Sequence, residues 1–276
     1  VLDEIKDATA KLARALDVRG LMNIQFAVKD EDGWPTIYVI EVNPRASRTV
    51  PFVSKATGVP LAKMAAKVMA GVSLKELGLT SDPIPYHVSV KEAVFPFSKF
   101  AGVDIVLGPE MRSTGEVMGI SERFSLAFAK SQEAAGNLLP TEGKIFLSVA
   151  DREKPKLVGL ARQLATMGYE LFSTRGTADH LKAAGIEVTR LKKLKEGRPN
   201  VLDMMESNEL ALIMNTPNGK GARTDEGSIR AAAVTRGIPY LTTIQAAEAA
   251  VRAMLAVRTE GVTVQAIQDR FAVLPK

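Results

Sequence analysis

Hydrophobic residues recur at helical spacing at the start of the chain, where Leu2, Ile5, Leu12 and Leu16 are separated by charged residues. This spacing predicts an amphipathic helix within residues 1–18.

Two strand-like runs follow at residues 21–29 and 36–43, and the polar residues 30–35 between them include Gly33. This arrangement predicts a β-hairpin. The remaining expectations for the first half are a buried helix at 60–71, a strand at 88–94 and a loop-rich, site-lining segment at 98–119.

Turn-forming residues cluster at 136–143, and a regular alternation of strands and helices begins after them. We therefore place a domain boundary between residues 1–139 and 140–276. The expected strands are 144–149, 169–172, 187–190, 210–215 and 239–242, and the expected helices are 155–167, 178–184, 200–206, 228–236 and 244–258. This alternation is typical of an α/β domain whose doubly wound parallel sheet binds ligands at the carboxyl ends of its strands.

The composition adds limits to this picture. The chain has 276 residues, of which 46% are hydrophobic and 24% charged, and no apolar run approaches the length of a membrane span. Its first residues carry no pattern of a signal peptide. Zero cysteines exclude disulfides, thiolate metal ligands and a thiol nucleophile. We expect a cytoplasmic protein that does not bind membranes.

The net charge of +5 arises in the second half, where basic residues gather at Arg190, Lys192, Lys193, Lys195 and Arg198. Such a cluster suits a small phosphate-bearing ligand, although an ordinary solvated surface is the alternative. Few aromatic residues lie among these basic side chains, so nucleic acid is not the expected partner.

Oxygen-bearing side chains are expected to meet on the hairpin. Glu41 and Asn43 are two apart on one strand, so both leave the same face. If the hairpin is centred on Gly33, Gln25 lies opposite Glu41. Such oxygen ligands suit Mg²⁺ on nucleotide phosphates, and the nearby Arg45 and Arg48 suit a phosphoryl group. A plain solvent-exposed face remains the alternative.

The runs at residues 21–27 and 40–55 resemble the end of an ATP-grasp domain of the carbamoyl-phosphate synthetase large subunit. Further likeness at 89–92 and 107–119 extends the resemblance over the chain. It implies that Gln25 and Glu41 contact ATP and, with Asn43, hold Mg²⁺ or Mn²⁺, with K⁺ as a further candidate ion. It also implies catalytic roles for Arg45 and Arg48 at the carbamate end.

This resemblance implies an α/β chain in which the C-terminal lobe of an ATP-grasp domain, itself α+β, precedes a methylglyoxal-synthase-like allosteric domain. The parent would be an ATP-dependent ligase that makes carbamoyl phosphate from bicarbonate and glutamine-derived ammonia for pyrimidine and arginine biosynthesis. Its expected partners are the remainder of the large subunit, a glutaminase small subunit and, in a homo-oligomer, further copies of the same protein. Because the lobe that clamps ATP is expected upstream of Val1, the isolated chain should be inactive.

A second group of candidates lies in residues 140–276. Residues 173–177 follow an expected strand and open a helix, so their backbone N–H groups and threonine hydroxyls could hold a phosphate. The resemblance implies a pocket that binds UMP and IMP. Its expected residues are Lys154, Thr174, Gly176, Thr177, Lys193, Asn215 and Thr216.

The same resemblance implies an ornithine-like effector site at Glu92, Tyr240 and Thr242. Leu241 departs from the acidic residue of the family pattern, and Pro217 departs from a threonine. Two alternative functions remain. One is a stand-alone nucleotide-binding regulatory module without catalysis, and the other is a methylglyoxal synthase, for which His180 lacks a convincing set of aspartates.

Overall fold

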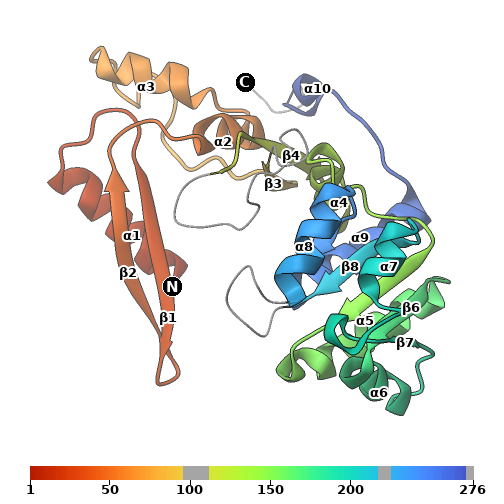
Figure 1. Ribbon diagram of the computed structural model, residues 1–276. Coiled ribbons are helices and arrows are strands. Elements are labelled where there is room, and N and C mark those ends of the chain that lie inside the picture. Colours follow the sequence, from red (N-terminus) through yellow and green to blue (C-terminus); the bar gives the residue numbers. More distant parts are fainter. Residues whose placement is uncertain (96–111, 217–224, 272–276) are drawn as a thin grey trace. The chain divides into compact units, whose positions relative to one another are not determined.

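The computed structural model describes residues 1–95, 112–216 and 225–271 (Figure 1). The chain divides into two compact units, Val1–Tyr86 with Gln265–Lys276, and His87–Val264. The boundary that we place between residues 139 and 140 rests on a change in sequence pattern, whereas these units are defined by compactness. The domain boundary therefore stays a prediction.

The first unit contains the predicted amphipathic helix and β-hairpin. Its elements are α1 (Leu2–Ala15), β1 (Asn23–Glu31), β2 (Trp34–Asn43), α2 (Thr49–Thr57), α3 (Leu61–Met69) and α10 (Ile267–Phe271). The hairpin turns on Asp32 and Gly33, whose φ angles of 54° and 88° are those of a tight two-residue turn. The strands therefore extend further into the predicted turn than expected. Helix α2 was not predicted.

Little apolar surface is buried within the first unit. Among its described residues, Ala56 is the single buried hydrophobic side chain, and helix α1 contains no buried residue. Leu2 is 76% exposed and Ile40 is 61% exposed. A unit of this size needs more burial than this to be stable alone, so its apolar faces fit contact with further protein.

The second unit begins with the antiparallel strands β3 (Val88–Val94) and β4 (Gly115–Ser121), followed by α4 (Phe124–Ala134). A Cβ atom on Gly119 would lie 1.9 Å from the carbonyl oxygen of Ala127, so glycine permits this close packing of strand and helix. The expected strand at 88–94 is confirmed. The loop prediction is wrong for residues 115–119, because they pair in β4; its residues 98–111 lie outside the described ranges, as does Pro217.

A five-stranded parallel sheet forms the rest of the second unit, with strand order β7-β6-β5-β8-β9. Its strands are β5 (Lys144–Ser148), β6 (Glu170–Thr174), β7 (Thr189–Leu191), β8 (Leu210–Asn215) and β9 (Tyr240–Leu241). Its helices are α5 (Lys154–Thr166), α6 (Arg175–Ala183), α7 (Val201–Glu206), α8 (Asp225–Thr235) and α9 (Ile244–Glu260). The expected alternation of strands and helices is confirmed.

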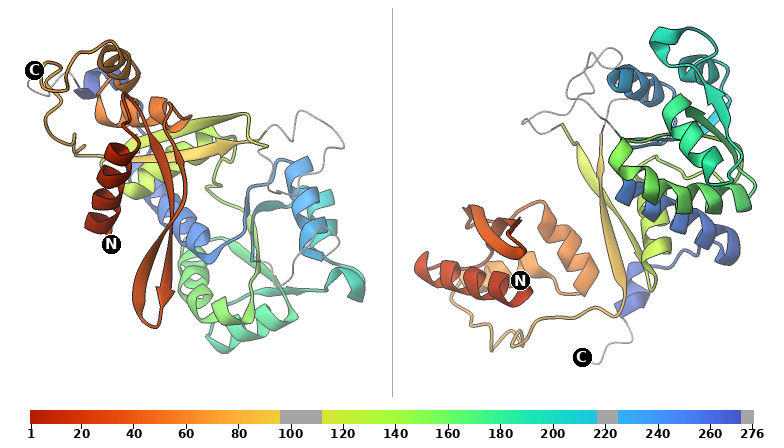
Figure 2. Two further views of the ribbon diagram at one scale, coloured as in Figure 1. Left: turned by 90° about the vertical axis from the view of Figure 1, so that its left-hand side faces the viewer. Right: turned by 90° about the horizontal axis from the view of Figure 1, so that it is seen from below.

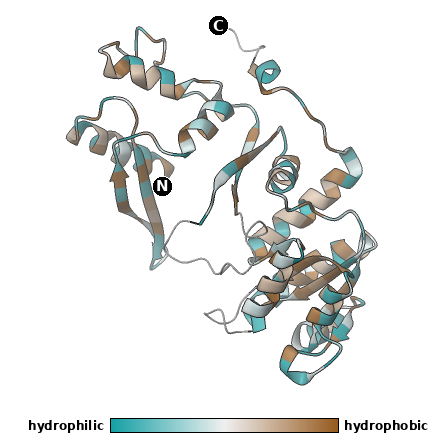
Figure 3. Cartoon of the chain, turned by 45° about the horizontal axis from the view of Figure 1, so that its top comes forward, coloured by the Kyte–Doolittle hydropathy of each residue, from teal (hydrophilic) through white to brown (hydrophobic). Residues whose placement is uncertain are grey.

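Helices cover both faces of this sheet (Figure 2). Successive residues of β5 point to opposite sides: Ile145 and Leu147 belong to a core cluster with residues of α5, α6 and α9, whereas Phe146 packs with residues of α7 and α8. Figure 3 shows the sheet strands as mainly hydrophobic, as burial on both faces requires. The doubly wound fold class is therefore confirmed for this part of the chain.

Strand order also fixes where a ligand can bind. The chain runs from β5 outward to β6 and β7, then returns to β8 on the other side of β5. The direction of winding reverses between β5 and β8, which opens a crevice at the carboxyl ends of these strands.

Candidate functional site

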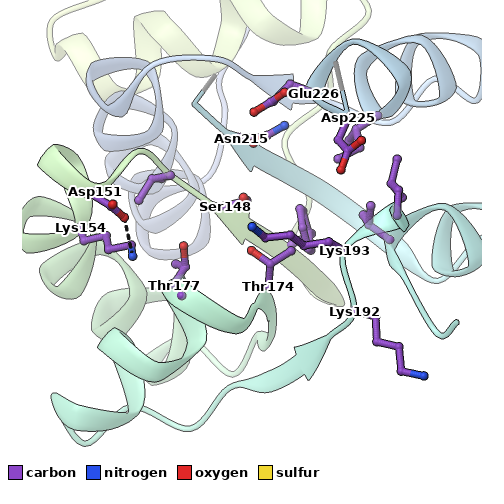
Figure 4. A pocket seen from close by; sticks show the side chains of 16 residues that line it. Ser148, Asp151, Lys154, Thr174, Thr177, Lys192, Lys193, Asn215, Asp225 and Glu226 are labelled. Carbon is purple, nitrogen blue, oxygen red and sulfur yellow. Dashed lines mark ion pairs between the residues drawn. The ribbon is translucent and has the colours of Figure 1, made fainter. Parts of the chain in front are cut away.

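A pocket lies at the carboxyl ends of the parallel strands (Figure 4). Six of the seven residues predicted for nucleotide binding line it: Lys154, Thr174, Gly176, Thr177, Lys193 and Asn215. They come from the last residues of β6 and β8 and from the segments that follow β5, β6 and β7, so residues far apart in sequence meet through the topology of the sheet.

Lys154 is held at one end of the pocket. Its Nζ lies 2.7 Å from Oδ1 of Asp151, and its side chain is 16% exposed. A Cβ atom on Gly176 would lie 3.2 Å from the same Nζ, so the missing side chain leaves room for the ammonium group beside the start of α6. Hydrogen bonding to Lys154, helped by the charge of Lys193, lowers the pKa of Asp151.

Thr174 and Thr177 present hydroxyl groups where β6 turns into α6. Thr174 occupies the N-cap position of α6 with an extended backbone and makes no capping hydrogen bond through its side chain, and neither of the two hydroxyls has a hydrogen-bond partner among the described residues. Ser173, one position earlier, instead points its hydroxyl into the protein and donates to the carbonyl of Leu147 over 2.5 Å. The helix start therefore presents to the pocket two hydroxyl groups that the described residues leave without a hydrogen-bond partner.

The predicted basic cluster is only partly brought together. Lys192 and Lys193 line the pocket, but Figure 4 shows Lys193 reaching into it and Lys192 pointing away. Arg198 forms an ion pair with Asp203, and Arg190 and Lys195 are not among the lining residues. Lys193 is thus the member of the cluster placed to meet a ligand.

Asn215 ends β8 and lines the pocket from the opposite side to Lys154. Its amide Nδ2 donates to the hydroxyl of Tyr240 over 2.7 Å. Burial raises the pKa of Tyr240, while the bond from Asn215 and the charge of Arg230 act in the opposite direction. The tyrosine therefore remains a neutral partner that orients the amide.

Thr216 does not line the pocket, although it was predicted to do so. Its side chain is buried, and its hydroxyl accepts a hydrogen bond from the backbone N–H of Ala150 over 2.9 Å. This bond ties β8 to the loop that leads into α5. Thr216 thus supports the segment that carries Asp151 and Lys154.

Three carboxylates also line the pocket and were not predicted from the sequence: Asp151, Asp225 and Glu226. Asp225 and Glu226 begin α8, on the side of Asn215. Their signal was weak, because acidic residues at a helix start are common and stabilise the helix dipole. Only the folded structure shows that Asp225 and Glu226 line the same pocket as Lys154, across the pocket from it.

The residues predicted for the ornithine-like site make their hydrogen bonds to other described residues and not to one another. Glu92 accepts a hydrogen bond from Gln132 over 2.8 Å, whereas Tyr240 bonds to Asn215. Thr242 follows β9 and is half-buried. Burial raises the pKa of Glu92, and the bond from Gln132 opposes that shift.

A second candidate site lies on the β-hairpin of the first unit. Gln25 pairs directly with Glu41, as predicted, and Asn23 pairs with Asn43. Directly opposed residues of an antiparallel pair project from the same face, so the amide of Gln25 and the carboxylate of Glu41 lie on one side of the hairpin. A bulge follows Gln25 and changes the register toward the turn.

Polar contacts continue from this pair toward Arg45. Asn43 donates through Nδ2 to Oε1 of Glu41 over 2.9 Å, which places both side chains side by side. Nη2 of Arg45 donates to Oδ1 of Asn43 over 3.5 Å. Arg48 is exposed at the start of α2. The guanidinium groups of Arg45 and Arg48 thus come shortly after Glu41 and Asn43 in the sequence.

The oxygen cluster suits a hard divalent cation by its chemistry. It offers one carboxylate and two amide oxygens, from Glu41, Gln25 and Asn43. Such ligands are those that Mg²⁺ and Mn²⁺ accept, together with phosphate oxygens. The described parts of the chain contain no group of three or more His, Cys, Asp or Glu side chains placed to hold a metal ion.

The described helices are too short or too polar for any of them to span a bilayer.

Two parts of the sequence match known families. Residues 1–77 match the family described as "Carbamoyl-phosphate synthase L chain, ATP binding domain", and residues 156–242 match the "MGS-like domain". The first match contains the hairpin cluster, and the second contains most of the residues that line the pocket.

Curated relatives align with almost the whole chain. The carbamoyl phosphate synthase large chain of Rhodopirellula baltica is 64% identical over 272 residues, which cover 99% of this chain and 25% of the relative. A protein of the same name from Methanosarcina barkeri is 50% identical over 98% of this chain and 67% of its own length. The chain thus spans about a quarter of the length of the first of these relatives.

Among solved structures, a methylglyoxal synthase from Elizabethkingia anophelis NUHP1 aligns with 41% of this chain and 79% of its own, with 19% sequence identity and a TM-score of 0.35. This likeness is too low to support an argument about function.

Proposed function

The chain belongs to the carbamoyl phosphate synthase large-chain family, and from that premise we propose that it is the C-terminal part of such a subunit, with two roles. Its hairpin supplies metal and ATP-phosphate ligands for carbamate phosphorylation, and its parallel-sheet domain binds a regulatory nucleotide. The observation that carries the first role is the direct pairing of Gln25 with Glu41.

The proposed parent enzyme is a glutamine-hydrolysing, ATP-dependent ligase that makes carbamoyl phosphate from bicarbonate, ammonia and ATP for pyrimidine and arginine synthesis. Its partners are the rest of the large subunit and a glutaminase small subunit. A cytoplasmic location and assembly into homo-oligomers belong to the same proposal.

On the hairpin, Gln25, Glu41 and Asn43 would hold the cation. A bound Mg²⁺ or Mn²⁺ would neutralise charge on the nucleotide phosphates. Arg45 and Arg48 would bind the oxygens of the carbamate or carbamoyl phosphate end, where bidentate guanidinium bonds fix orientation and stabilise negative charge. Arg45 is already oriented by its contact with Asn43.

In the pocket, a nucleoside monophosphate such as UMP or IMP would place its phosphate against Thr174, Gly176 and Thr177, with Lys154 and Lys193 beside it. The free hydroxyls and the start of α6 support this placement. The other end, with Asn215 and the two carboxylates of α8, offers acceptors for the hydroxyl and N–H groups of a nucleoside. The ornithine-like response through Glu92, Tyr240 and Thr242 remains part of this proposal.

A direct test uses the 276-residue chain and two readouts. Calorimetric titration should show UMP binding, because every described residue of the pocket lies in one compact unit. ATP turnover with bicarbonate and ammonia should equal a buffer blank, because the first unit buries little of its own apolar surface and needs the rest of the subunit. Phosphate release above the blank would contradict the assignment of the chain as part of a larger catalytic site.

A stand-alone regulatory module is the second candidate, and one observation favours it: the second unit contains both hydrophobic core clusters. The two candidates differ in the gene. An uninterrupted reading frame upstream of Val1 that encodes the rest of a large chain would exclude the stand-alone module. Turnover of dihydroxyacetone phosphate would instead indicate a methylglyoxal synthase.

A further inference from the structure

Charges alternate along the nucleotide pocket. Figure 4 shows Asp151 and Lys154 at one end, Lys193 and Thr174 near the middle, and Asp225 with Glu226 at the far end. The cationic groups that suit a phosphate are therefore enclosed between carboxylates on both sides. This layout limits how much negative charge the pocket can accept.

Asp151 is the carboxylate at the phosphate end. Its side chain is 92% exposed, while that of its partner Lys154 is 16% exposed, so Asp151 stands at the rim and Lys154 lies inside. Its lowered pKa keeps it ionised at neutral pH. The ammonium group lies between the carboxylate and the free donors at the start of α6.

A monophosphate ester fits this arrangement. Its oxygens can accept bonds from the hydroxyls of Thr174 and Thr177, from backbone N–H groups and from Lys154. With the nucleoside directed toward Asn215, any second or third phosphate would extend away from it, toward the rim where Asp151 stands. Reversing the ligand would bring the extra phosphates to Asp225 and Glu226 instead.

We infer that Asp151 is a specificity-determining residue that makes the pocket select nucleoside monophosphates and reject nucleoside di- and triphosphates. The inference rests on the proposed nucleotide site and adds to it. Repulsion between the carboxylate and a β- or γ-phosphate is the discriminating force, and the ion pair with Lys154 keeps the carboxylate in place.

The test compares dissociation constants for UMP, UDP and UTP, measured by calorimetry without divalent cations on the 276-residue chain. The variants are Asp151→Asn, which removes the charge, and Asp151→Glu, which keeps it. Asp179→Asn is the matched control, since Asp179 is an exposed residue of α6 that does not line the pocket.

Wild type, Asp151→Glu and Asp179→Asn should all prefer UMP to UTP. In Asp151→Asn the ratio of the UTP to the UMP dissociation constant should fall by about three- to thirtyfold, as expected for loss of one like charge a few ångströms away. An unchanged ratio would overturn the inference, even if the affinities for UMP and UTP both fell by the same factor. Asp151 would then only support Lys154. Failure of wild type to bind UMP would instead overturn the proposed nucleotide site itself.

Discussion

Gln25 lies directly opposite Glu41 in the β1–β2 ladder, so an amide and a carboxylate share one face of a two-stranded sheet. Asn43 extends that face by a hydrogen bond to Glu41, and Arg45 contacts Asn43 in turn. The proposed cation site therefore depends on the register in which β1 pairs with β2. A shift of one residue would turn the strand over and remove Gln25 from the cluster.

Changing Lys154 to Ala should weaken UMP binding about 10- to 100-fold, because a charge-assisted hydrogen bond contributes about 1.5–3 kcal/mol. Calorimetric titration measures the effect. Lys156→Ala removes the same kind of side chain from an exposed position of α5 and should bind UMP as wild type does. Equal affinities for the two variants would mean that the phosphate binds elsewhere.

Gly176→Ala should weaken UMP binding by about three- to tenfold. The new methyl group would lie 3.2 Å from Nζ of Lys154, so the ammonium must move from its position beside the start of α6. Thermal unfolding should change little, since this glycine has no positive φ angle to maintain. Unaltered binding would show that Lys154 does not need this close approach.

The matched variant Gly159→Ala should raise the free energy of unfolding by about 0.5–1 kcal/mol, because alanine restricts the unfolded chain and favours helix. Gly159 lies in α5, and a Cβ atom there would meet nothing within 4 Å. Denaturant unfolding measures the gain. Nucleotide binding should be unaffected, and a loss of stability would contradict the open space around this position.

Glu92→Gln should become increasingly stabilising as pH rises from 4 to 7. Burial raises the pKa of Glu92, so the folded protein keeps this proton to a higher pH than the unfolded chain does. Stability present below the ordinary glutamate pKa of about 4.3 is then lost as pH rises through the folded value. Glutamine imitates the neutral form and avoids that loss.

Unfolding free energies of wild type and Glu92→Gln at several pH values give the comparison. The exposed Glu187→Gln serves as control and should show no pH-dependent difference from wild type. A difference between Glu92→Gln and wild type that stays constant, or shrinks toward neutral pH, would contradict the assigned cause of the pKa shift.

The sequence predicts local features well where a single physical rule decides them. The Asp32–Gly33 turn fixes the hairpin register, and the glycine and threonines at the junction of β6 and α6 mark the helix start that we propose to bind phosphate. Thr216 does not line the pocket, and its position after a strand does not reveal that its hydroxyl accepts a hydrogen bond from the backbone of Ala150.

Features that depend on tertiary contacts were missed. Strand β4 contains Gly115 and Gly119, which usually weaken a strand, but packing against α4 requires the second of them. Asp151 and Glu226 look like ordinary surface residues in the sequence. They enter the pocket only because the parallel sheet brings the ends of its strands together.

The most direct measurement of the central claim is ATP-dependent carbamoyl phosphate formation by the complete large chain with the proposed glutaminase partner, with Glu41→Gln in this segment. The substitution keeps the size of the side chain and removes the carboxylate proposed to hold the cation. Glu122→Gln, at an exposed position after β4, is the control. The account predicts at least about a hundredfold loss for Glu41→Gln and none for the control. Wild-type rates and Mg²⁺ dependence in Glu41→Gln would contradict it.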